Sequence, residues 1–142
     1  MVDIDPINEV TAVPAAPPGE ALAHFAALLT YETDCWDVHE SMGPDGRGAE
    51  DVVVLDVRSP DLYAEGHVPG AINLPHRRIV DRNVERFDER TTFVVYCAGP
   101  HCNGADKAAM RLAALGRPVK KMIGGVTGWI DEGFELETGA AS

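Results

Sequence analysis

The sequence predicts an α/β fold with a central, mostly parallel sheet and helices on both faces. Two apolar runs rich in β-branched residues, at 52–55 and 92–96, show no alternation of polar and apolar positions. Strands of this kind are covered on both faces, as in a parallel sheet. Segments with helical periodicity lie between and after the two runs, the clearest of them at 104–115. Strands that alternate with helices are typical of α/β domains.

Before the first run, the sequence predicts an extended tail and two helices. Residues 1–19 end in Ala-Ala-Pro-Pro-Gly, a sequence that favours extended chain. From Glu20 onward, apolar residues recur at helical spacing and form one face, which consists of Leu22, Phe25, Ala26 and Leu29. A second short helix is expected after Asp34, a residue type that caps helices. One side of that helix carries Cys35, Val38 and Met42.

After the first run, the expected elements are short. Residues 59–61 combine an N-cap serine, a proline at the first helical position and an acidic first turn, so a short helix is expected up to Gly66. Short strands are expected at 71–74 and at 119–123, the second of which carries two lysines. The charged segment 77–90 gives no clear assignment.

The composition limits the kind of protein and its partners. A chain of 142 residues suits one domain, which we place at 20–137, with short tails at 1–19 and 138–142. The formal net charge of −11 argues against nucleic acid and anionic membranes, because basic surfaces bind both. No apolar run approaches the roughly 20 residues of a membrane span. Three cysteines in such a chain indicate thiols and not a disulfide scaffold, so we expect a cytoplasmic protein.

The loop Cys97-Ala98-Gly99-Pro100-His101-Cys102-Asn103 stands where a functional site is expected. It follows the strand at 92–96 and precedes the helix at 104–115. Ligands bind beyond the carboxyl ends of parallel strands, and the N–H groups at a helix N-terminus stabilise an anion. We therefore expect a lowered pKa for Cys97 and a loop that holds a thiolate or the terminal sulfur of a persulfide. Gly99 lets the backbone curl close to the sulfur, and Pro100 stiffens the curl.

Three motifs resemble those of rhodanese-like domains, and they occur in the family's order. The first comprises Asp-Val-Arg-Ser-Pro at 56–60 and Tyr-Ala-Glu-Gly-His-Val-Pro-Gly-Ala-Ile-Asn at 63–73. The second is Tyr96-Cys97 with the loop that follows. The third is Gly-Gly-Val-Thr-Gly-Trp at 124–129, which also begins a short final helix. The resemblance covers roughly residues 20 to 135.

The resemblance implies a rhodanese fold with a five-stranded parallel sheet, and a sulfurtransferase. Such an enzyme takes sulfane sulfur from a donor and holds it as a persulfide until a thiophilic acceptor, such as a thiol or cyanide, removes it. By motif position the nucleophile is Cys97. The substrate-binding loop consists of Ala98, Gly99, Pro100, His101, Cys102 and Asn103. The chemistry requires no metal and no cofactor, and a partner protein is a further possible donor or acceptor.

Two features of the loop depart from the family pattern. Members that use thiosulfate often carry arginine or lysine in this loop, whereas residues 98–103 contain neither. We therefore expect a persulfide on a small thiol or on a partner protein to be a better donor than thiosulfate. The second feature is Cys102, which is either a resolving thiol for Cys97 or a small apolar residue that packs inward.

Other roles and other classes remain open at this point. Asp56, Arg58 and His67 are expected to hold the first motif together rather than to react. Alternative functions are a redox sensor that uses Cys97 and Cys102, and a non-catalytic binding module. A cysteine phosphatase is disfavoured because the first arginine after Cys97 is Arg111, well inside the helix. Zinc is disfavoured because the two loop cysteines lack a second paired-cysteine motif.

The expected state of Cys97 can be tested by alkylation. In the reduced protein, the rate of Cys97 alkylation should follow a titration whose midpoint lies below that of an ordinary thiol, because the loop and the helix N-terminus favour the thiolate. Mass spectrometry after timed alkylation across a pH series measures this midpoint. An ordinary thiol titration would contradict the expectation.

Overall fold

The computed structural model describes residues 8–141, and its contacts divide the chain into two compact units, Met1–Thr30 and Tyr31–Ser142. The first unit holds α1 (Glu9–Ala12) and nearly all of α2 (Pro18–Tyr31). The helix expected from Glu20 is present, but it begins at Pro18, because proline is compatible with the first turn of a helix. Its expected apolar face is largely exposed, with Leu22, Phe25 and Leu29 exposed by 72%, 60% and 68%. Residues 1–7 of the expected tail lie outside the described residues.

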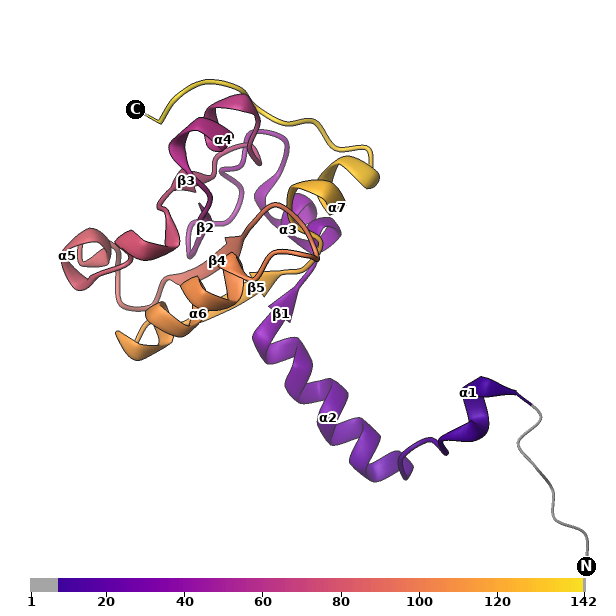
Figure 1. Cartoon of the computed structure of the whole chain (residues 1–142). Helices are drawn as coiled ribbons and strands as arrows, with labels where there is room; N and C mark the ends of the chain where they lie inside the picture. Colours follow the sequence, from indigo (N-terminus) through magenta and orange to yellow (C-terminus); the bar gives the residue numbers. More distant parts are fainter. Residues whose placement is uncertain (1–7, 142) are drawn as a thin grey trace, which may run out of the picture. The chain divides into compact units, whose positions relative to one another are not determined.

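The second unit is built on a five-stranded parallel sheet in the order β1-β5-β4-β2-β3 (Figure 1). The strands are β1 (Glu32–Thr33), β2 (Val52–Asp56), β3 (Ile72–Asn73), β4 (Thr92–Tyr96) and β5 (Val119–Met122). The predicted α/β fold with a parallel sheet is therefore confirmed. Strand β1 was not predicted, because a strand of two residues has no recognisable period.

Helices lie between and after the strands of this unit. They are α3 (Cys35–Met42), α4 (Pro60–Glu65), α5 (Asp81–Val84), α6 (Gly104–Ala114) and α7 (Gly125–Asp131), with a 3₁₀ turn, η1 (His76–Arg78). The Asp34 carboxylate accepts a hydrogen bond from the Asp37 N–H at 2.8 Å, and the Ser59 hydroxyl accepts one from the Leu62 N–H at 3.3 Å. Across residues 8–141, no helix has both the length and the apolar character needed to span a bilayer.

Side chains that alternate along the strands bury both faces of the sheet. On one face, Val54 of β2 and Val94 of β4 belong to a cluster with α3 and α7, which supply Val38, Met42 and Trp129. On the other face, neighbouring strand residues pack against α5 and α6: Leu55, Phe93 and Val95 meet Val84, Ala108 and Leu112. This double coverage explains why the two strands read as continuous apolar runs.

A pair of substitutions on α6 tests this packing. Leu112 is fully buried, whereas Met110 on the same helix is 67% exposed. Leu112→Ala should lower the free energy of unfolding by about 2–5 kcal/mol, because it leaves a cavity in the core. Met110→Ala should change it by less than about 0.5 kcal/mol. Urea denaturation measures both values, and equal losses would contradict the assignment of the buried face.

Candidate functional site

The loop at 97–103 leaves the carboxyl end of β4 and turns back into α6. Tyr96, the last residue of β4, is fully buried, and Cys97 directly after it is 8% exposed. The turn is closed by the Cys102 N–H, which donates a hydrogen bond to the carbonyl of Gly99 at 3.1 Å. Helix α6 then begins at Gly104. The chain therefore places Cys97 where parallel α/β sheets bind their ligands.

The start of α7 clamps the first half of this loop. The Val126 N–H donates to the carbonyl of Cys97 at 3.1 Å, and the Thr127 N–H donates to the carbonyl of Ala98 at 3.0 Å. The Thr127 hydroxyl adds a bond to the same Ala98 carbonyl at 3.1 Å. Gly125 has a φ of +59°, and a Cβ there would collide with the Cys97 carbonyl oxygen. These residues belong to the third motif, but their contact with the loop was not predicted.

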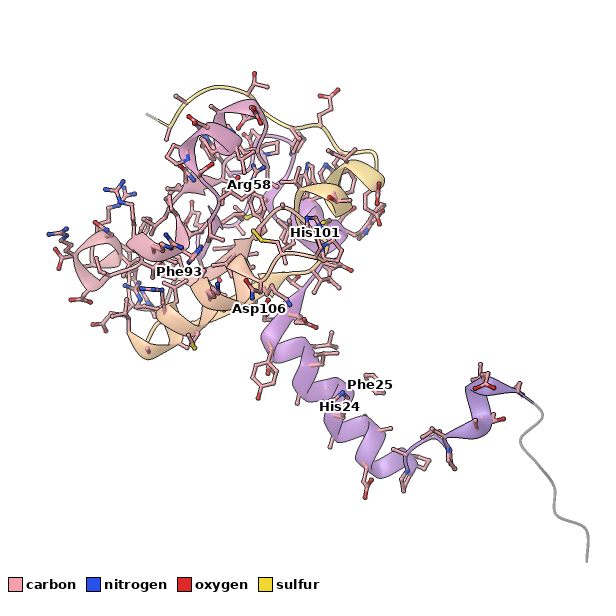
Figure 2. The ribbon with its side chains drawn as sticks, viewed as in Figure 1. His24, Phe25, Arg58, Phe93, His101 and Asp106 are labelled. Carbon is pink, nitrogen blue, oxygen red and sulfur yellow. A yellow bond between two sulfur atoms is a disulfide. The ribbon has the colours of Figure 1, made fainter. Side chains whose placement is uncertain are left out.

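Cys97 and Cys102 are joined by a disulfide, shown as a yellow bond in Figure 2. Their Cα atoms lie 6.4 Å apart, inside the range that disulfides span. The Gly104 N–H donates a hydrogen bond to Sγ of Cys102 at 3.4 Å. A Cβ on Gly104 would lie 2.9 Å from Sγ of Cys97 and 3.5 Å from Sγ of Cys102. Both sulfur atoms therefore face the first residue of α6, where only glycine leaves room for them.

The disulfide corrects the expectation that all three cysteines are thiols. The turn closed at Gly99 brings the two loop cysteines together, a proximity that sequence spacing alone does not establish. Within residues 8–141, Cys35 is the free cysteine. Burial, with the nearby charges of Asp34 and Glu132, raises the pKa of Cys35 to about 11, so this thiol stays protonated at neutral pH. Cys102 also makes apolar contacts, since it packs against the core cluster that includes Cys97.

A pocket of about 200 Å³ opens beside the two sulfur atoms. Of the predicted loop residues, Cys97, Gly99, Pro100 and Cys102 line it, together with Asp106 of α6 and the segment 121–125. The remaining loop residues, Ala98, His101 and Asn103, do not line this pocket. Its volume lies below the 300–1,000 Å³ typical of sites for drug-sized ligands. The pocket therefore suits a small group.

The charge of the lysine in this pocket is already balanced. Lys121 Nζ lies 3.0 Å from a carboxylate oxygen of Asp106 and 3.5 Å from one of Glu32. The hydrogen bond to Asp106 raises the pKa of Lys121, so the ammonium stays charged. Two carboxylates around one ammonium leave no net positive charge for an anionic ligand. Nowhere in residues 8–141 do three or more His, Cys, Asp or Glu side chains gather so that they could hold a metal ion.

Positive side chains gather instead between η1 and α6. Burial lowers the pKa of His76, and the charges of Lys107, Arg77 and Arg111 lower it further. His76 is therefore neutral at pH 7. None of these four residues lines the pocket beside Cys97.

Asp56 ties the first motif to the strand that carries the loop. Its carboxylate is fully buried and is paired with the Arg58 guanidinium at 2.6 Å, which also donates to the carbonyl of Gly66 at 2.6 Å. The Tyr96 hydroxyl donates to the same carboxylate at 2.8 Å and accepts the Val68 N–H at 3.0 Å. Burial, together with the charge of Asp56, raises the pKa of Tyr96, so its hydroxyl remains a donor.

His67 lies in the same motif and is held by contacts on both sides of its ring. The ring stacks on Tyr63 with centroids 3.6 Å apart, and Nδ1 lies 2.7 Å from the carbonyl oxygen of Tyr63. Nε2 lies 3.7 Å from a carboxylate oxygen of Glu137. Neither His67 nor Asp56 nor Arg58 lines the pocket beside Cys97. Their contacts support positioning of the strand ends rather than reaction with a substrate.

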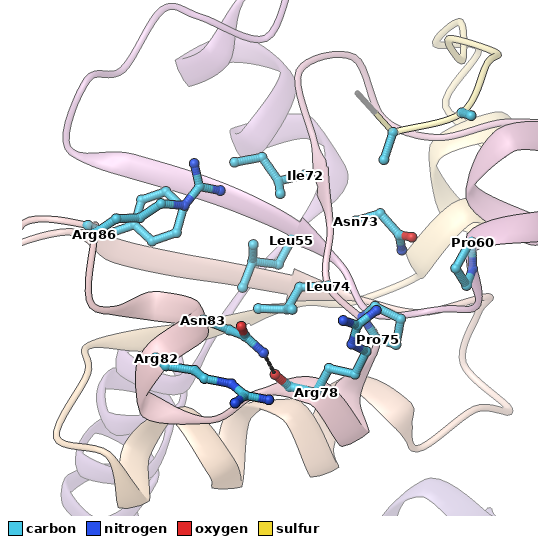
Figure 3. Close-up of a pocket in the computed structure, with 13 residues that line it drawn as sticks. Leu55, Pro60, Ile72, Asn73, Leu74, Pro75, Arg78, Arg82, Asn83 and Arg86 are labelled. Carbon is cyan, nitrogen blue, oxygen red and sulfur yellow. Dashed lines mark hydrogen bonds between the residues drawn. The ribbon is translucent and has the colours of Figure 1, made fainter.

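A separate groove of about 480 Å³ lies along the β3 edge of the sheet (Figure 3). Its lining includes Leu55 and Leu74 on the apolar side, with Arg78, Arg82 and Arg86 from η1 and the α5 region. The Asn83 amide donates to the carbonyl of Arg78 at 2.7 Å. Arg78 lines this groove but not the pocket beside Cys97, and Cys97 does not line the groove.

Comparison with known proteins decides the family. The model of the rhodanese-like domain matches residues 45–132, more than half of the chain. The chain belongs to the rhodanese-like family. Among solved structures, the BH2092 protein of Bacillus halodurans is 39% identical with a TM-score of 0.80, and the match covers 86% of this chain and 87% of that one.

Two curated relatives of this rhodanese-like chain carry different descriptions. The thiosulfate sulfurtransferase GlpE of Pseudomonas entomophila is 38% identical over 90 residues, which cover 62% of this chain and 72% of GlpE. The HTH-type transcriptional regulator Rv0324 of Mycobacterium tuberculosis is 37% identical over 94 residues, which cover 66% of this chain. The match spans only 41% of that regulator.

Two glycines with similar backbone angles test the clamp on the loop. Gly125 and Gly133 have φ of +59° and +84°, but a Cβ on Gly133 would have no atom within 4 Å. Gly133→Ala should cost about 1 kcal/mol of unfolding free energy, from backbone strain alone. Gly125→Ala should cost about 1–3 kcal/mol more, because the new Cβ collides with the Cys97 carbonyl. Urea denaturation of both variants measures the difference, and equal costs would show that α7 does not press on the loop.

Proposed function

We propose that this protein is a sulfurtransferase that carries sulfane sulfur as a persulfide on Cys97. The position of Cys97 carries the proposal. Cys97 lies at the carboxyl end of β4, in a loop that hydrogen bonds from α7 hold in place, and its sulfur lies beside a pocket of about 200 Å³. Membership of the rhodanese-like family and the relatives named as sulfurtransferases support the same reaction class.

In this reaction, the thiolate of Cys97 attacks the sulfane sulfur of a donor and displaces the rest of the donor. The extra sulfur then stays on Cys97 until a thiol or cyanide removes it, which restores the thiolate. Gly99, Pro100 and Cys102 line the pocket beside the sulfur, and the hydrogen bonds from α7 to the carbonyls of Cys97 and Ala98 hold the loop backbone. We propose that the reaction takes place in the cytoplasm, with a small molecule or a partner protein as donor or acceptor.

We further propose that the donor is a persulfide on a thiol rather than thiosulfate. Thiosulfate carries two negative charges, and the loop offers no arginine or lysine to balance them. Lys121, which lines the pocket, is already paired with Asp106 and Glu32. The formal net charge of −11 adds an unfavourable long-range field.

The disulfide supports a second candidate function, reversible redox sensing by Cys97 and Cys102. In that case an oxidant closes the disulfide and a reductant opens it, without any sulfur transfer. The two candidates differ in whether Cys97 gains a sulfur atom. A non-catalytic binding module has less support, because Cys97 is present and faces a pocket.

Intact-protein mass spectrometry tests whether Cys97 carries sulfur. The Cys102→Ser variant is the best form for this test, because its Cys97 has no disulfide partner. This variant is reduced, separated from the reductant and exposed to glutathione persulfide. It should then gain the mass of one sulfur atom, and a reductant should remove that sulfur. The Cys97→Ser variant should gain none. If folded Cys102→Ser with an alkylatable Cys97 gains no sulfur from glutathione persulfide or thiosulfate, the proposed function is wrong.

Steady-state kinetics test the choice of donor. With cyanide as the common acceptor, kcat/KM should be higher for glutathione persulfide than for thiosulfate, because the pocket has no uncompensated cation. A clear preference for thiosulfate would contradict this assignment.

A further inference from the structure

We propose that Cys102 resolves the persulfide on Cys97: it attacks Sγ of Cys97, releases the outer sulfur as hydrosulfide and closes the Cys97–Cys102 disulfide. This inference rests on the proposed function, because it needs a persulfide on Cys97. It adds an activity to sulfur transfer, namely the reduction of sulfane sulfur to sulfide within one loop.

The first support is the contact between the two sulfur atoms. The structure joins them in a disulfide, with the loop backbone closed by the hydrogen bond from the Cys102 N–H to the Gly99 carbonyl. The attack of Cys102 on Sγ of Cys97 forms the same bond. The product of the proposed step is therefore compatible with the folded loop, the clamp of α7 and the start of α6.

The second support is the environment of Cys102. The Gly104 N–H, at the N-terminus of the eleven-residue helix α6, donates a hydrogen bond to Sγ of Cys102. In the reduced state, a donor in that position stabilises the thiolate, which is the attacking form. The absence of a side chain at Gly104 gives both sulfur atoms room on the same side of the helix start.

The third support is access. Cys97 is 8% exposed, and the pocket beside it is small. An external thiol must enter this pocket before it reaches the persulfide, whereas Cys102 is already part of the lining. An internal nucleophile in contact with its target has an effective concentration far above that of a free thiol.

The step balances without an added oxidant. The Cys102 thiolate forms a bond to Sγ of Cys97, and the bond between Sγ and the outer sulfur breaks. The outer sulfur leaves with the electron pair of that bond as HS⁻. The sulfane sulfur is reduced to sulfide, and the two cysteine sulfurs are oxidised to the disulfide. A thiol reductant, such as a dithiol, then reopens the disulfide and returns both thiols.

A single-turnover experiment separates this activity from simple sulfur carriage. Wild-type protein and Cys102→Ser are reduced, freed of reductant under nitrogen and mixed with one equivalent of glutathione persulfide. Released sulfide is measured over time, and the mass of the alkylated protein is measured by mass spectrometry. A sample without donor controls for oxidation by traces of air.

The wild-type protein should release close to one equivalent of sulfide and lose two hydrogen atoms as its disulfide closes. Cys102→Ser should retain one extra sulfur on Cys97 and release sulfide at least about tenfold more slowly, because only external thiols can remove it. Cys35→Ser is the matched control. Its hydroxyl can keep the bonds that the Cys35 thiol makes to the carbonyls of Ile123 and Gly125, so it should behave like wild type.

Other outcomes overturn the inference and leave the proposed function in place. One is a stable persulfide on wild-type Cys97 beside a free Cys102 thiol. Another is an extra sulfur atom on Cys102, detected by peptide mapping. That result would show that Cys102 attacks the outer sulfur of the persulfide and not Sγ of Cys97. If Cys102→Ser itself gains no sulfur, the proposed function fails first. Cys102→Ala replaces the serine variant if circular dichroism shows that the latter does not fold.

Discussion

The buried carboxylate of Asp56 is the interaction on which the rest of this site depends. A charge with no exposure must be paired and hydrogen-bonded, and Asp56 is bound by the guanidinium and backbone N–H of Arg58 and by the hydroxyl of Tyr96. The Asn73 amide donates to the carbonyls of Asp56 and Arg58 at 3.1 and 3.0 Å. These contacts fix the carboxyl ends of three neighbouring strands, β2, β3 and β4. Tyr96 is thereby held in place immediately before Cys97.

Close backbone approach is the second constraint, and it acts on Cys97 and Ala98 themselves. The Cys97 and Ala98 carbonyls accept hydrogen bonds from the first turn of α7, and this requires Gly125 to lie against them. Gly104 allows the sulfur atoms the same close approach at the start of α6. The Asp56 network therefore holds Tyr96 immediately before the loop, and the starts of α6 and α7 contact the loop itself. A loop held in this way presents its sulfur with little freedom to reorganise.

The elements that the sequence predicted are those marked by a continuous apolar run or by a capping residue next to the helix. The runs that became β2 and β4 were recognisable because each buries both faces, and α3 and α4 were recognisable because Asp34 and Ser59 cap them. Strand β1 has two residues, and η1 and α5 have three and four, so none of them contains a full pattern. The segment 77–90 therefore gave no assignment, although it forms part of a groove.

The site also contains features that the sequence predicted and contacts that it did not. The strand-end position and the motif order marked Cys97, because both are local properties of the sequence. The pairing of Lys121 with Asp106 joins residues 15 apart, and the bond from Thr127 to Ala98 joins residues 29 apart. Contacts of this kind depend on how the helices dock, which no local pattern encodes. The disulfide between the loop cysteines belongs with them, because spacing alone allowed either contact or separate packing.

Burial and charge together bear on the fate of a sulfur atom held on Cys97. The paired Lys121 gives the pocket no net attraction for small anions, and the low exposure of Cys97 restricts external acceptors. The same burial brings Cys102 within bonding distance and places a backbone donor on its sulfur. An open loop with a free cation would favour exchange with dissolved anions. We propose that this closed loop instead favours transfer from a persulfide that enters sulfur first, followed by reaction within the protein.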